Sequence, residues 1–362
     1  MALTVGIIGL PNVGKSTLLN ALAQAGAEAS NYPFCTIERN CGGVAVPDER
    51  LRRLAEILHP DEVIPTTVTF IDIAGLVKGA SRGEGLGNKF LHHVREANVL
   101  AHVLRCFESQ DVSHVHGVIN PLQDLEVVET ELILADLERV EKWIEQEKLS
   151  AKAKPKGERA ELTFLETVRE RLSRGECVRL EETGERDLAL FDELNLLTSK
   201  PRLYVLNTGE ADPRGTGAIC RSVADAVGED DIFVVSAKIE EEIAAIPEDE
   251  REEFMQALGI DEDAKKRFIE KCHGLLGLIR YYTTAHGKLQ AWSIADGTTA
   301  PRAAGKIHTD MERGFIRAEV MSYEDIVSFE SKSAVQHHGQ LRTEGHDYVI
   351  RDGDVVEFHF NR

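Results

Sequence analysis

The sequence lacks the features that would place the protein in a membrane, in an oxidising compartment or on bare nucleic acid. It has no run of 18 apolar residues, so no membrane-spanning helix is expected. Its six cysteines contain no Cys-x-x-Cys pair, which favours free cytosolic thiols over a zinc site or a disulfide framework. Basic residues are also scarce: 42 Lys and Arg stand against 62 Asp and Glu, for a net charge of −20. Such a surface repels phosphate backbones, so nucleic-acid binding needs a local basic exception.

The N-terminus lacks the basic residues of a secretory signal. Its opening, MALTVGIIGL, is apolar and runs directly into a glycine-rich motif that the protein needs. We therefore expect a cytoplasmic protein. With 362 residues, 42% hydrophobic and 29% charged, the composition is typical of a soluble globular chain of two or three domains.

The strongest motif is a glycine-rich loop between a predicted strand and a predicted helix. Residues 3–8 (LTVGII) form an apolar, β-branched run, residues 9–16 (GLPNVGKS) fit G-x-x-x-x-G-K-S/T, and apolar residues then recur with helical spacing. Glycines let backbone N–H groups turn toward phosphates, and the helix N-terminus adds partial positive charge. Lys15 is the predicted catalytic cation at the β- and γ-phosphates, and the Ser16 hydroxyl is a predicted Mg²⁺ ligand. The predicted phosphate-binding residues are Asn12, Val13, Gly14, Lys15, Ser16 and Thr17.

Two further segments have the composition of nucleotide switches. Residues 66–73 predict a strand, and Asp72 near its end begins the pattern Asp-x-x-Gly. A carboxylate there supports Mg²⁺, and Gly75 offers its N–H to the γ-phosphate. Residues 75–87 hold five glycines, which favours either a mobile switch or a plain flexible loop. Upstream, Thr36 in NYPFCTIERN is the candidate Mg²⁺-contacting hydroxyl of a first switch.

The position after Asp-x-x-Gly lacks the glutamine that orients the attacking water in Ras-like enzymes. Leu76 stands there, and its side chain cannot hydrogen-bond water. We therefore expect slow intrinsic hydrolysis unless another group places the water. His114 and His116, in a loop after the predicted strand 99–107, are candidates, because a neutral imidazole orients water near pH 7. From the residues alone, they are equally well two exposed loop histidines.

The base-recognition motif of common GTPases is altered. Residues 207–210 (NTGE) stand where Asn-Lys-x-Asp is expected, whereas residues 236–238 (SAK) match the turn that covers the base. An aspartate would accept from both N1–H and the N2 amine of guanine, and Glu210 is one methylene longer. Asn207 keeps an amide that can donate to N7 and accept from the adenine N6 amine. The motif weakens the case for guanine and allows adenine without proving it. The predicted base contacts are Asn207, Glu210, Ser236, Ala237 and Lys238.

An insertion with helical periodicity separates the predicted strands 99–107 and 203–206. Apolar residues recur at helical spacing in residues 125–144 and 162–172, and the segment between them, LSAKAKPKGE, predicts a turn. We expect an antiparallel helical hairpin. Residues 142–156 hold five lysines against two glutamates, which is the local basic exception in an acidic chain. This tip, from Lys148 to Lys156, either contacts RNA phosphates or is a solvated loop.

The pattern changes again near Leu278. Short β-like runs at residues 289–294, 315–320, 348–351 and 355–360 alternate with glycine turns, and a helix is expected after Thr309. These features predict a small α+β module of about 85 residues.

These motifs together closely resemble the YchF family of Obg-like ATPases. The resemblance rests on GLPNVGKST, NYPFCTIE, DIAGLVKGASRGEGLGNKFL, RCFE, the N-x-x-E tetrad and AAGKIHTDMERGFIRAE, and it runs from Met1 to Arg362. One departure is Thr208-Gly209, where the family pattern has Val-Asn. The resemblance implies a Ras-like nucleotide-binding domain at residues 1–120 and 201–277. It also implies an inserted helical coiled-coil domain at residues 121–200 and a ubiquitin-like α+β TGS domain at residues 278–362.

The resemblance also carries functional expectations. It implies Mg²⁺-dependent hydrolysis of ATP to ADP and phosphate, binding to the 70S ribosome or its 50S subunit, and regulation of translation. It makes His114 a water-orienting residue, adds nothing for His116, and leaves rRNA contacts open for the lysine tip and the TGS domain. No membrane or DNA partner is expected. An Obg-type GTPase acting in ribosome assembly, and a nucleotide-dependent scaffold with negligible turnover, are the alternatives.

Overall fold

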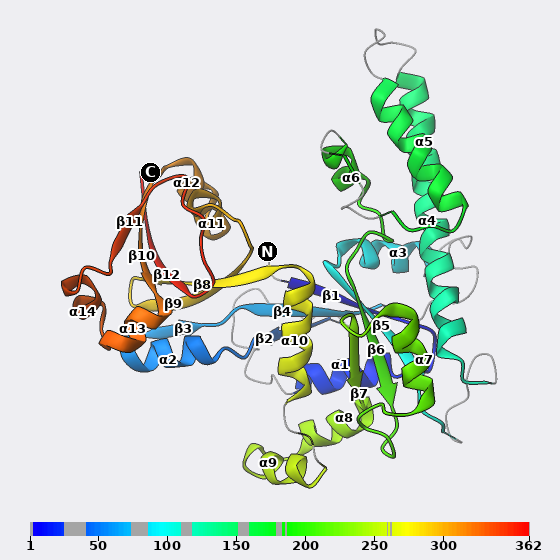
Figure 1. Ribbon diagram of the computed structural model, residues 1–362, viewed down its shortest axis with the longest axis horizontal. Coiled ribbons are helices and arrows are strands. Elements are labelled where there is room, and N and C mark those ends of the chain that lie inside the picture. The colour runs from blue at the N-terminus through cyan, green and yellow to red at the C-terminus, as the bar shows by residue number, and fades with distance from the viewer. Residues whose placement is uncertain are drawn as a thin grey trace.

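The computed structural model describes residues 3–24, 41–73, 86–109, 118–150, 159–178, 183–184, 187–258, 260 and 263–361 (Figure 1). Its strands are β1 (Leu3–Ile8), β2 (Cys41–Ala45), β3 (Glu62–Ile64), β4 (Thr67–Asp72), β5 (Val99–Cys106), β6 (Arg202–Thr208), β7 (Ile232–Val235), β8 (Leu278–Ala285), β9 (Lys288–Ala295), β10 (Phe315–Ser322), β11 (Arg342–Glu344) and β12 (Asp354–Phe360). Its helices are α1 (Lys15–Gln24), α2 (Glu49–Leu58), α3 (Leu86–Glu96), α4 (Pro121–Ser150), α5 (Arg159–Ser173), α6 (Leu188–Leu194), α7 (Ala218–Val227), α8 (Ala237–Ala245), α9 (Glu248–Ala257), α10 (Ala264–Leu275), α11 (Ala300–Ile307), α12 (Thr309–Arg313), α13 (Tyr323–Phe329) and α14 (Lys332–His337).

The first sheet has the strand order β2-β4-β1-β5-β6-β7 and is parallel except for β2. Its central strands are buried on both faces, which is why they are near-continuous apolar runs in the sequence. Leu104 and Leu206 pack with residues of α4 and α7, whereas Val103 and Val205 belong to the cluster that holds Phe268 of α10. The predicted strand 3–8 coincides with β1, and the predicted strands 66–73 and 99–107 differ from β4 and β5 only at their ends.

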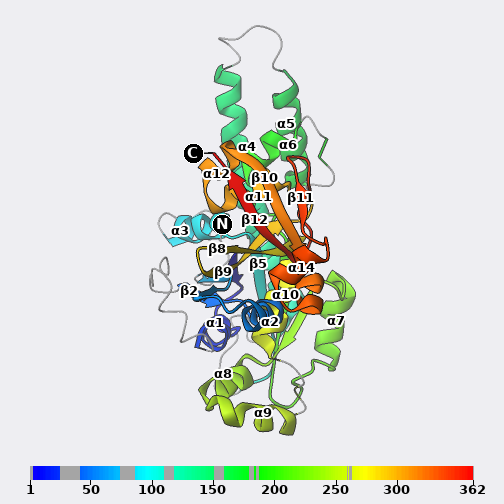
Figure 2. The same cartoon turned by 90° about the vertical axis from the view of Figure 1, so that its left-hand side faces the viewer.

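The insertion forms an arm. Helices α4 and α5 lie side by side and project away from both sheets, as Figures 1 and 2 show. They are held together by a separate apolar cluster that includes Val140, Ile144, Leu165 and Val168. The predicted helical hairpin is therefore present in the described part of the arm, and residues 151–158, with Lys152, Lys154 and Lys156, lie outside it.

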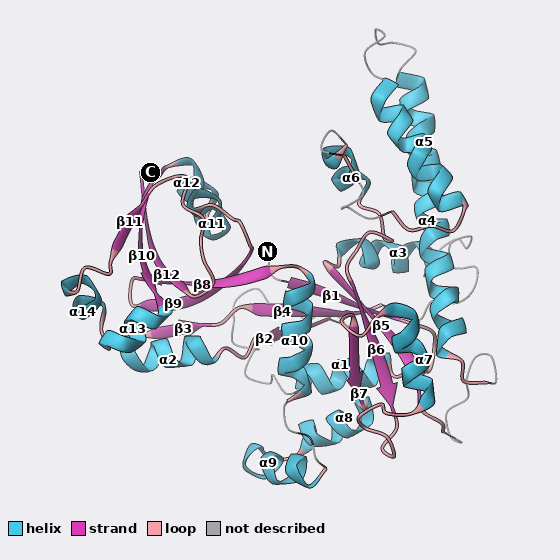
Figure 3. Ribbon diagram, viewed as in Figure 1, coloured by secondary structure: helices cyan, strands magenta, loops and turns pink. Residues whose placement is uncertain are grey.

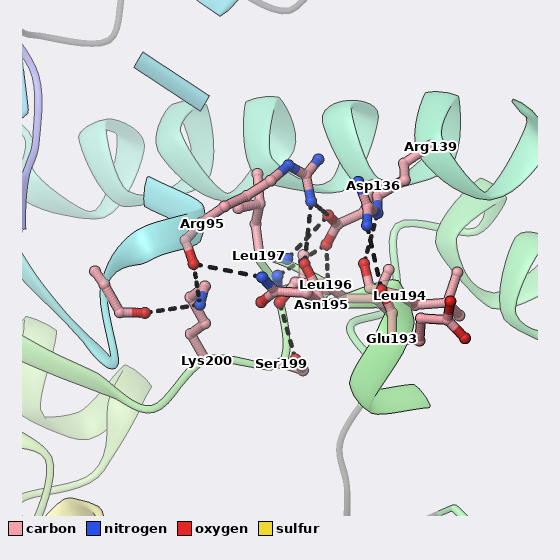
Figure 4. A network of polar contacts seen from close by, with 12 residues as sticks. Arg95, Asp136, Arg139, Glu193, Leu194, Asn195, Leu196, Leu197, Ser199 and Lys200 are labelled. Atoms are coloured by element: carbon pink, nitrogen blue, oxygen red, sulfur yellow. Dashed lines mark hydrogen bonds and ion pairs between the residues drawn. The ribbon is translucent and has the colours of Figure 1, made fainter. Parts of the chain in front are cut away.

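A polar network roots the arm in the first sheet (Figure 4). The fully buried carboxylate of Asp136 on α4 accepts hydrogen bonds from the N–H groups of Leu197 and Thr198 at 2.9 and 2.8 Å, and from the Thr198 hydroxyl at 2.9 Å. The Lys200 ammonium donates to the carbonyls of Arg95 and Ala97 at the end of α3, at 2.9 and 2.7 Å. The segment around residues 195–200 thus joins the arm to α3, the helix that follows the predicted second switch.

The second sheet has the order β11-β10-β12-β8-β9-β3 and lies on the other side of α10, as Figure 3 shows. Five of its strands come from the C-terminal region, and β3 comes from the segment between β2 and β4. The expected α+β module is present, but residues 348–351 are not a strand. Only Val349 makes a single bridge, to Thr299, flanked by hydrogen bonds from the Ala300 N–H to the Tyr348 carbonyl and from the Ile350 N–H to the Thr298 carbonyl. The Asp354 carboxylate accepts from the Arg351 N–H and the Tyr348 hydroxyl, across the turn at residues 352–353 that leads into β12.

Candidate nucleotide-binding site

The loop between β1 and α1 has the backbone of a phosphate cradle. Gly9, Asn12 and Gly14 have φ values of 145°, 63° and 97°, in the left-handed region that favours glycine. A Cβ on Gly9 would lie 2.5 Å from the Val103 carbonyl oxygen, and one on Gly14 would lie 2.2 Å from the Asn207 amide nitrogen. Both glycines of the motif are therefore required by close approach as well as by conformation.

Lys15 lies over this loop. Its ammonium donates to the carbonyls of Gly9 and Leu10 at 3.1 and 2.8 Å, and the side chain is buried. Burial lowers the pKa of Lys15, and the nearby Asp72 carboxylate acts in the opposite direction. Among the described residues, the hydrogen bonds of this buried ammonium go to two neutral carbonyls, so its charge attracts an anion and the geometry fits the predicted contact with β- and γ-phosphates.

The predicted metal ligands Ser16 and Asp72 meet in the structure. Asp72 is the last residue of β4, which pairs in parallel with β1, so its carboxylate lies beside the start of α1. The Ser16 hydroxyl donates to Asp72 Oδ2 at 2.8 Å. Asp72 Oδ1 is buried and has no hydrogen-bond partner among the described residues. A hydroxyl beside a carboxylate oxygen without a partner is a donor set that suits Mg²⁺, so these residues fit the ion.

Asn207 ties the phosphate loop to the base-covering turn. It is the last residue but one of β6, and its amide donates to the Val13 carbonyl at 2.8 Å while its oxygen accepts from the Ala237 N–H at 3.0 Å. One amide hydrogen and one oxygen lone pair remain for a base. The Thr208 hydroxyl donates to the Val235 carbonyl at 3.4 Å, which turns it toward β7.

Glu210 and Lys238 form an ion pair across the predicted base site. Each side chain is more than half exposed, so the pair is solvated and free to rearrange around a ligand. The Ser236 hydroxyl beneath them is buried and has no partner among the described residues.

Other predicted site residues lie outside the described residues: Thr36, Gly75, Leu76, His114 and His116. Their roles stay predictions. Conversely, the motifs indicated neither the hydrogen bonds of Asn207 with the phosphate loop and the base-covering turn nor the packing of α2 and β3 with the second sheet. No sequence signal pointed to the first, because the phosphate-loop motif already accounts for Gly14, the glycine that Asn207 approaches.

Comparison with known proteins decides the family. Residues 278–361 match the family model YchF-GTPase_C, "Protein of unknown function (DUF933)", and residues 4–148 match MMR_HSR1, "50S ribosome-binding GTPase". The chain is 47% identical to "Ribosome-binding ATPase YchF" of Bacillus subtilis over 365 residues, and 46% identical to the protein of that name from Escherichia coli O157:H7 over 362 residues. Each match covers 100% of both chains. The chain belongs to the YchF family.

Solved structures agree with the YchF assignment. The Schizosaccharomyces pombe YchF GTPase superposes with a TM-score of 0.84 at 34% identity, covering 99% of this chain and 97% of that one. A GTP-binding protein from Pyrococcus horikoshii OT3, 18% identical, shares the fold with a TM-score of 0.61, covering 99% and 100% of the two chains. The predicted fold class, an α/β phosphate-loop domain with a helical insertion and a C-terminal TGS-like domain, is confirmed.

Proposed function

We propose that the chain is a Mg²⁺-dependent ATPase that binds the ribosome and acts as a nucleotide switch in translation. The carrying observation is the meeting of Lys15, Ser16 and Asp72 at the mouth of the phosphate loop. The names of the curated YchF relatives support both the ATPase activity and the ribosome as partner. ATP is the proposed substrate, bound in preference to GTP or equally with it.

Lys15 and the loop N–H groups from Asn12 to Thr17 hold the phosphates, and Ser16 and Asp72, joined by Thr36, hold Mg²⁺. When bound, the ion neutralises charge that develops on the β- and γ-phosphate oxygens. Gly75 senses the γ-phosphate through its N–H. On binding, the Lys15 ammonium exchanges two neutral carbonyl partners for phosphate oxygens, a stronger charge-assisted contact in a buried place.

Hydrolysis is slow without an activator, because Leu76 offers no hydrogen bond to the attacking water. His114 is the proposed water-orienting residue. The products are ADP and phosphate. In the base site, the Asn207 amide hydrogen that the Val13 carbonyl does not take donates to the ring, and Glu210, one methylene longer than the usual aspartate, weakens the preference for guanine.

The ribosome, as 70S or 50S particle, is the proposed partner, with rRNA contacted by the lysine tip of the arm and by the TGS domain. This assigns the protein to the cytoplasm. In the described part of the chain, no helix is both long and apolar enough to cross a bilayer. We keep the domain boundaries 1–120 with 201–277, 121–200 and 278–362 as a proposal; within the first of them, β3 pairs in the second sheet and α2 packs against it.

Calorimetry tests the proposal. ATP and GTP, each with Mg²⁺, are titrated into nucleotide-free protein and into its Lys15→Ala variant. We expect ATP to bind at least as tightly as GTP, and Lys15→Ala to abolish tight binding of both, because the buried ammonium is the chain's own positive charge at the β- and γ-phosphates. Arg53→Ala, on the solvent side of α2, is the control and retains both affinities.

Three outcomes would contradict parts of this proposal. A hundredfold preference for GTP, about 2.7 kcal/mol, would favour the GTPase alternative. Normal ATP binding by Lys15→Ala would show that the site is misplaced. Turnover that stays negligible both alone and on ribosomes would favour the scaffold.

A further inference from the structure

The segment between β2 and β4 belongs to both sheets. Strands β2 and β4 pair as an antiparallel hairpin at the edge of the first sheet, from Cys41 opposite Ile71 to Ala45 opposite Thr67. The chain that connects them, however, forms α2 and β3, which leave this sheet. Strand β3 pairs in parallel with β9 of the second sheet, and the Asp61 N–H donates to the Gly287 carbonyl at 2.7 Å. The C-terminal module therefore holds the connection of a hairpin in the nucleotide domain.

Apolar packing fixes α2 to the C-terminal module. Leu51 and Leu54 are buried, and they lie in one cluster with residues of β8, β9, β10, α13, α14 and β12: Tyr282, Leu289, Ala291, Met321, Ile326, Val335 and Val355. Each buried leucine contributes about 1.5–3 kcal/mol of hydrophobic stabilisation. Because α2 supplies two leucines to this core, it is an integral part of the module.

Polar contacts fix the orientation of α2 on the C-terminal module; we call this contact the dock. The Asp48 carboxylate caps α2 by accepting from the N–H groups of Arg50 and Leu51, and it also accepts from the Tyr282 hydroxyl at 2.9 Å. The Arg50 guanidinium makes a two-pronged contact with Asp352 at 2.7 and 3.1 Å, and Asp352 also accepts from the Arg280 N–H at 2.8 Å. Side chains on both sides of the dock thus have matched partners in one fixed arrangement.

The far end of the same hairpin carries the Mg²⁺ side of the nucleotide site. Strand β4 ends at Asp72, about 17 Å from its start at Thr67 for an extended strand. It is hydrogen-bonded to β1 on one side and β2 on the other, so it moves as a stiff unit. Strand β2 begins at Cys41, shortly after Thr36 in the chain. Strand β4 is also paired with β1 from Leu3 opposite Val68 to Ile7 opposite Asp72, so a shift of the docked connection pulls the hairpin against the pairing that sets Asp72 beside Ser16.

We propose that α2 is a docking element through which the C-terminal module holds the β2–β4 hairpin where Asp72 meets Ser16. This inference rests on the proposed function. It makes Asp48, Arg50 and Tyr282 positioning residues for the Mg²⁺ side of the site, since none of them touches the nucleotide. By linkage, Mg²⁺–ATP in turn tightens the dock, so a partner that engages the C-terminal module changes the affinity for the nucleotide.

The test compares ATP affinity in Mg²⁺ with ATP affinity in EDTA, by calorimetry on the full chain. Arg50→Ala removes the two-pronged contact with Asp352, and Tyr282→Phe removes only the hydroxyl that donates to Asp48. We expect both variants to lose about fivefold of the gain in affinity that Mg²⁺ provides, with affinity in EDTA unchanged, because the phosphate loop itself is untouched. Arg50→Lys restores part of the gain.

Arg53→Ala is the matched control, because Arg53 pairs only with Glu56 on α2 itself among the ion pairs of the described residues. Equal losses in Mg²⁺ and in EDTA would indicate a general structural effect and overturn the inference, as would an undiminished Mg²⁺ gain in both variants. Either result leaves the ATPase proposal standing. Wild-type protein with no Mg²⁺ gain would overturn both. Tyr282→Phe keeps the buried ring, so it decides the question even where Arg50→Ala unfolds.

Discussion

His102 lies in the middle of the first sheet, in register between Ile8 of β1 and Tyr204 of β6. It is fully buried, and neither ring nitrogen has a hydrogen-bond partner among the described residues. Burial lowers the pKa of His102 to about 3, and the positive charges of Arg202 and Lys15 act in the same direction. The folded protein therefore holds a neutral imidazole throughout the physiological range.

Because of this histidine, the free energy of unfolding depends on pH. Between pH 6.5 and about 3 the unfolded chain takes up a proton at His102 that the folded protein excludes, so stability rises with pH and falls on acidification. The loss is about 1.4 kcal/mol per pH unit in that window. We expect His102→Leu to flatten this part of the stability–pH curve, measured by urea unfolding from pH 7 to 4. The exposed His337→Gln is the control, and an unchanged slope in His102→Leu would refute the assignment.

At the scale of elements, Asp136 decides how firmly the arm is rooted (Figure 4). Asp136→Ala leaves the N–H groups of Leu197 and Thr198 and the Thr198 hydroxyl without their acceptor. At about 1–3 kcal/mol for each buried group left unpaired, we expect a loss of roughly 3 kcal/mol or more. Hydrogen exchange at residues 196–200 should rise by two orders of magnitude or more.

The control for this change is Glu138→Ala on the same helix, because Glu138 is exposed and pairs with Lys142 one turn away. Exchange in residues 196–200 should stay at the wild-type rate in that variant. Protection that survives Asp136→Ala would mean that α6 and Arg139, which donates to the Leu194 carbonyl at 2.6 Å, hold the root by themselves.

Elements formed by residues close together in the sequence could be predicted, and elements that depend on contacts between distant segments could not. Strand β1 and the phosphate loop were predictable because a buried parallel strand is a continuous apolar run and the loop's chemistry is local. The contact between Ser16 and Asp72 was predictable because both motifs sit at the carboxyl ends of neighbouring parallel strands. By contrast, β3 is three residues long and exists through its pairing with β9. Asp136 resembles any charged residue of a helix until residues 196–200 cover it.

At the scale of the whole molecule, α2 and β3 of the nucleotide domain are built into the C-terminal module, and this has a measurable consequence. Leu54 belongs in sequence to the connection within the nucleotide domain, yet it is buried in the core of the C-terminal module. The chain has two tryptophans, Trp143 in the arm and Trp292 on β9 of the module. Each therefore reports on a different unit when the other is replaced by phenylalanine.

Leu54→Ala leaves a cavity in the module's core and should cost about 2–5 kcal/mol of stability. We expect urea unfolding followed at Trp292 to shift to lower urea, while the transition followed at Trp143 moves much less. Val140→Ala, in the arm's own cluster, is the reciprocal control and should shift the Trp143 signal instead. A Trp292 transition unmoved by Leu54→Ala would show that α2 contributes little to the module. Nucleotide affinity is proposed to depend on the same dock. In Leu54→Ala, added Mg²⁺–ATP should therefore move the unfolding transition followed at Trp292 part of the way back to the wild-type urea concentration, because binding to the folded state stabilises it by mass action.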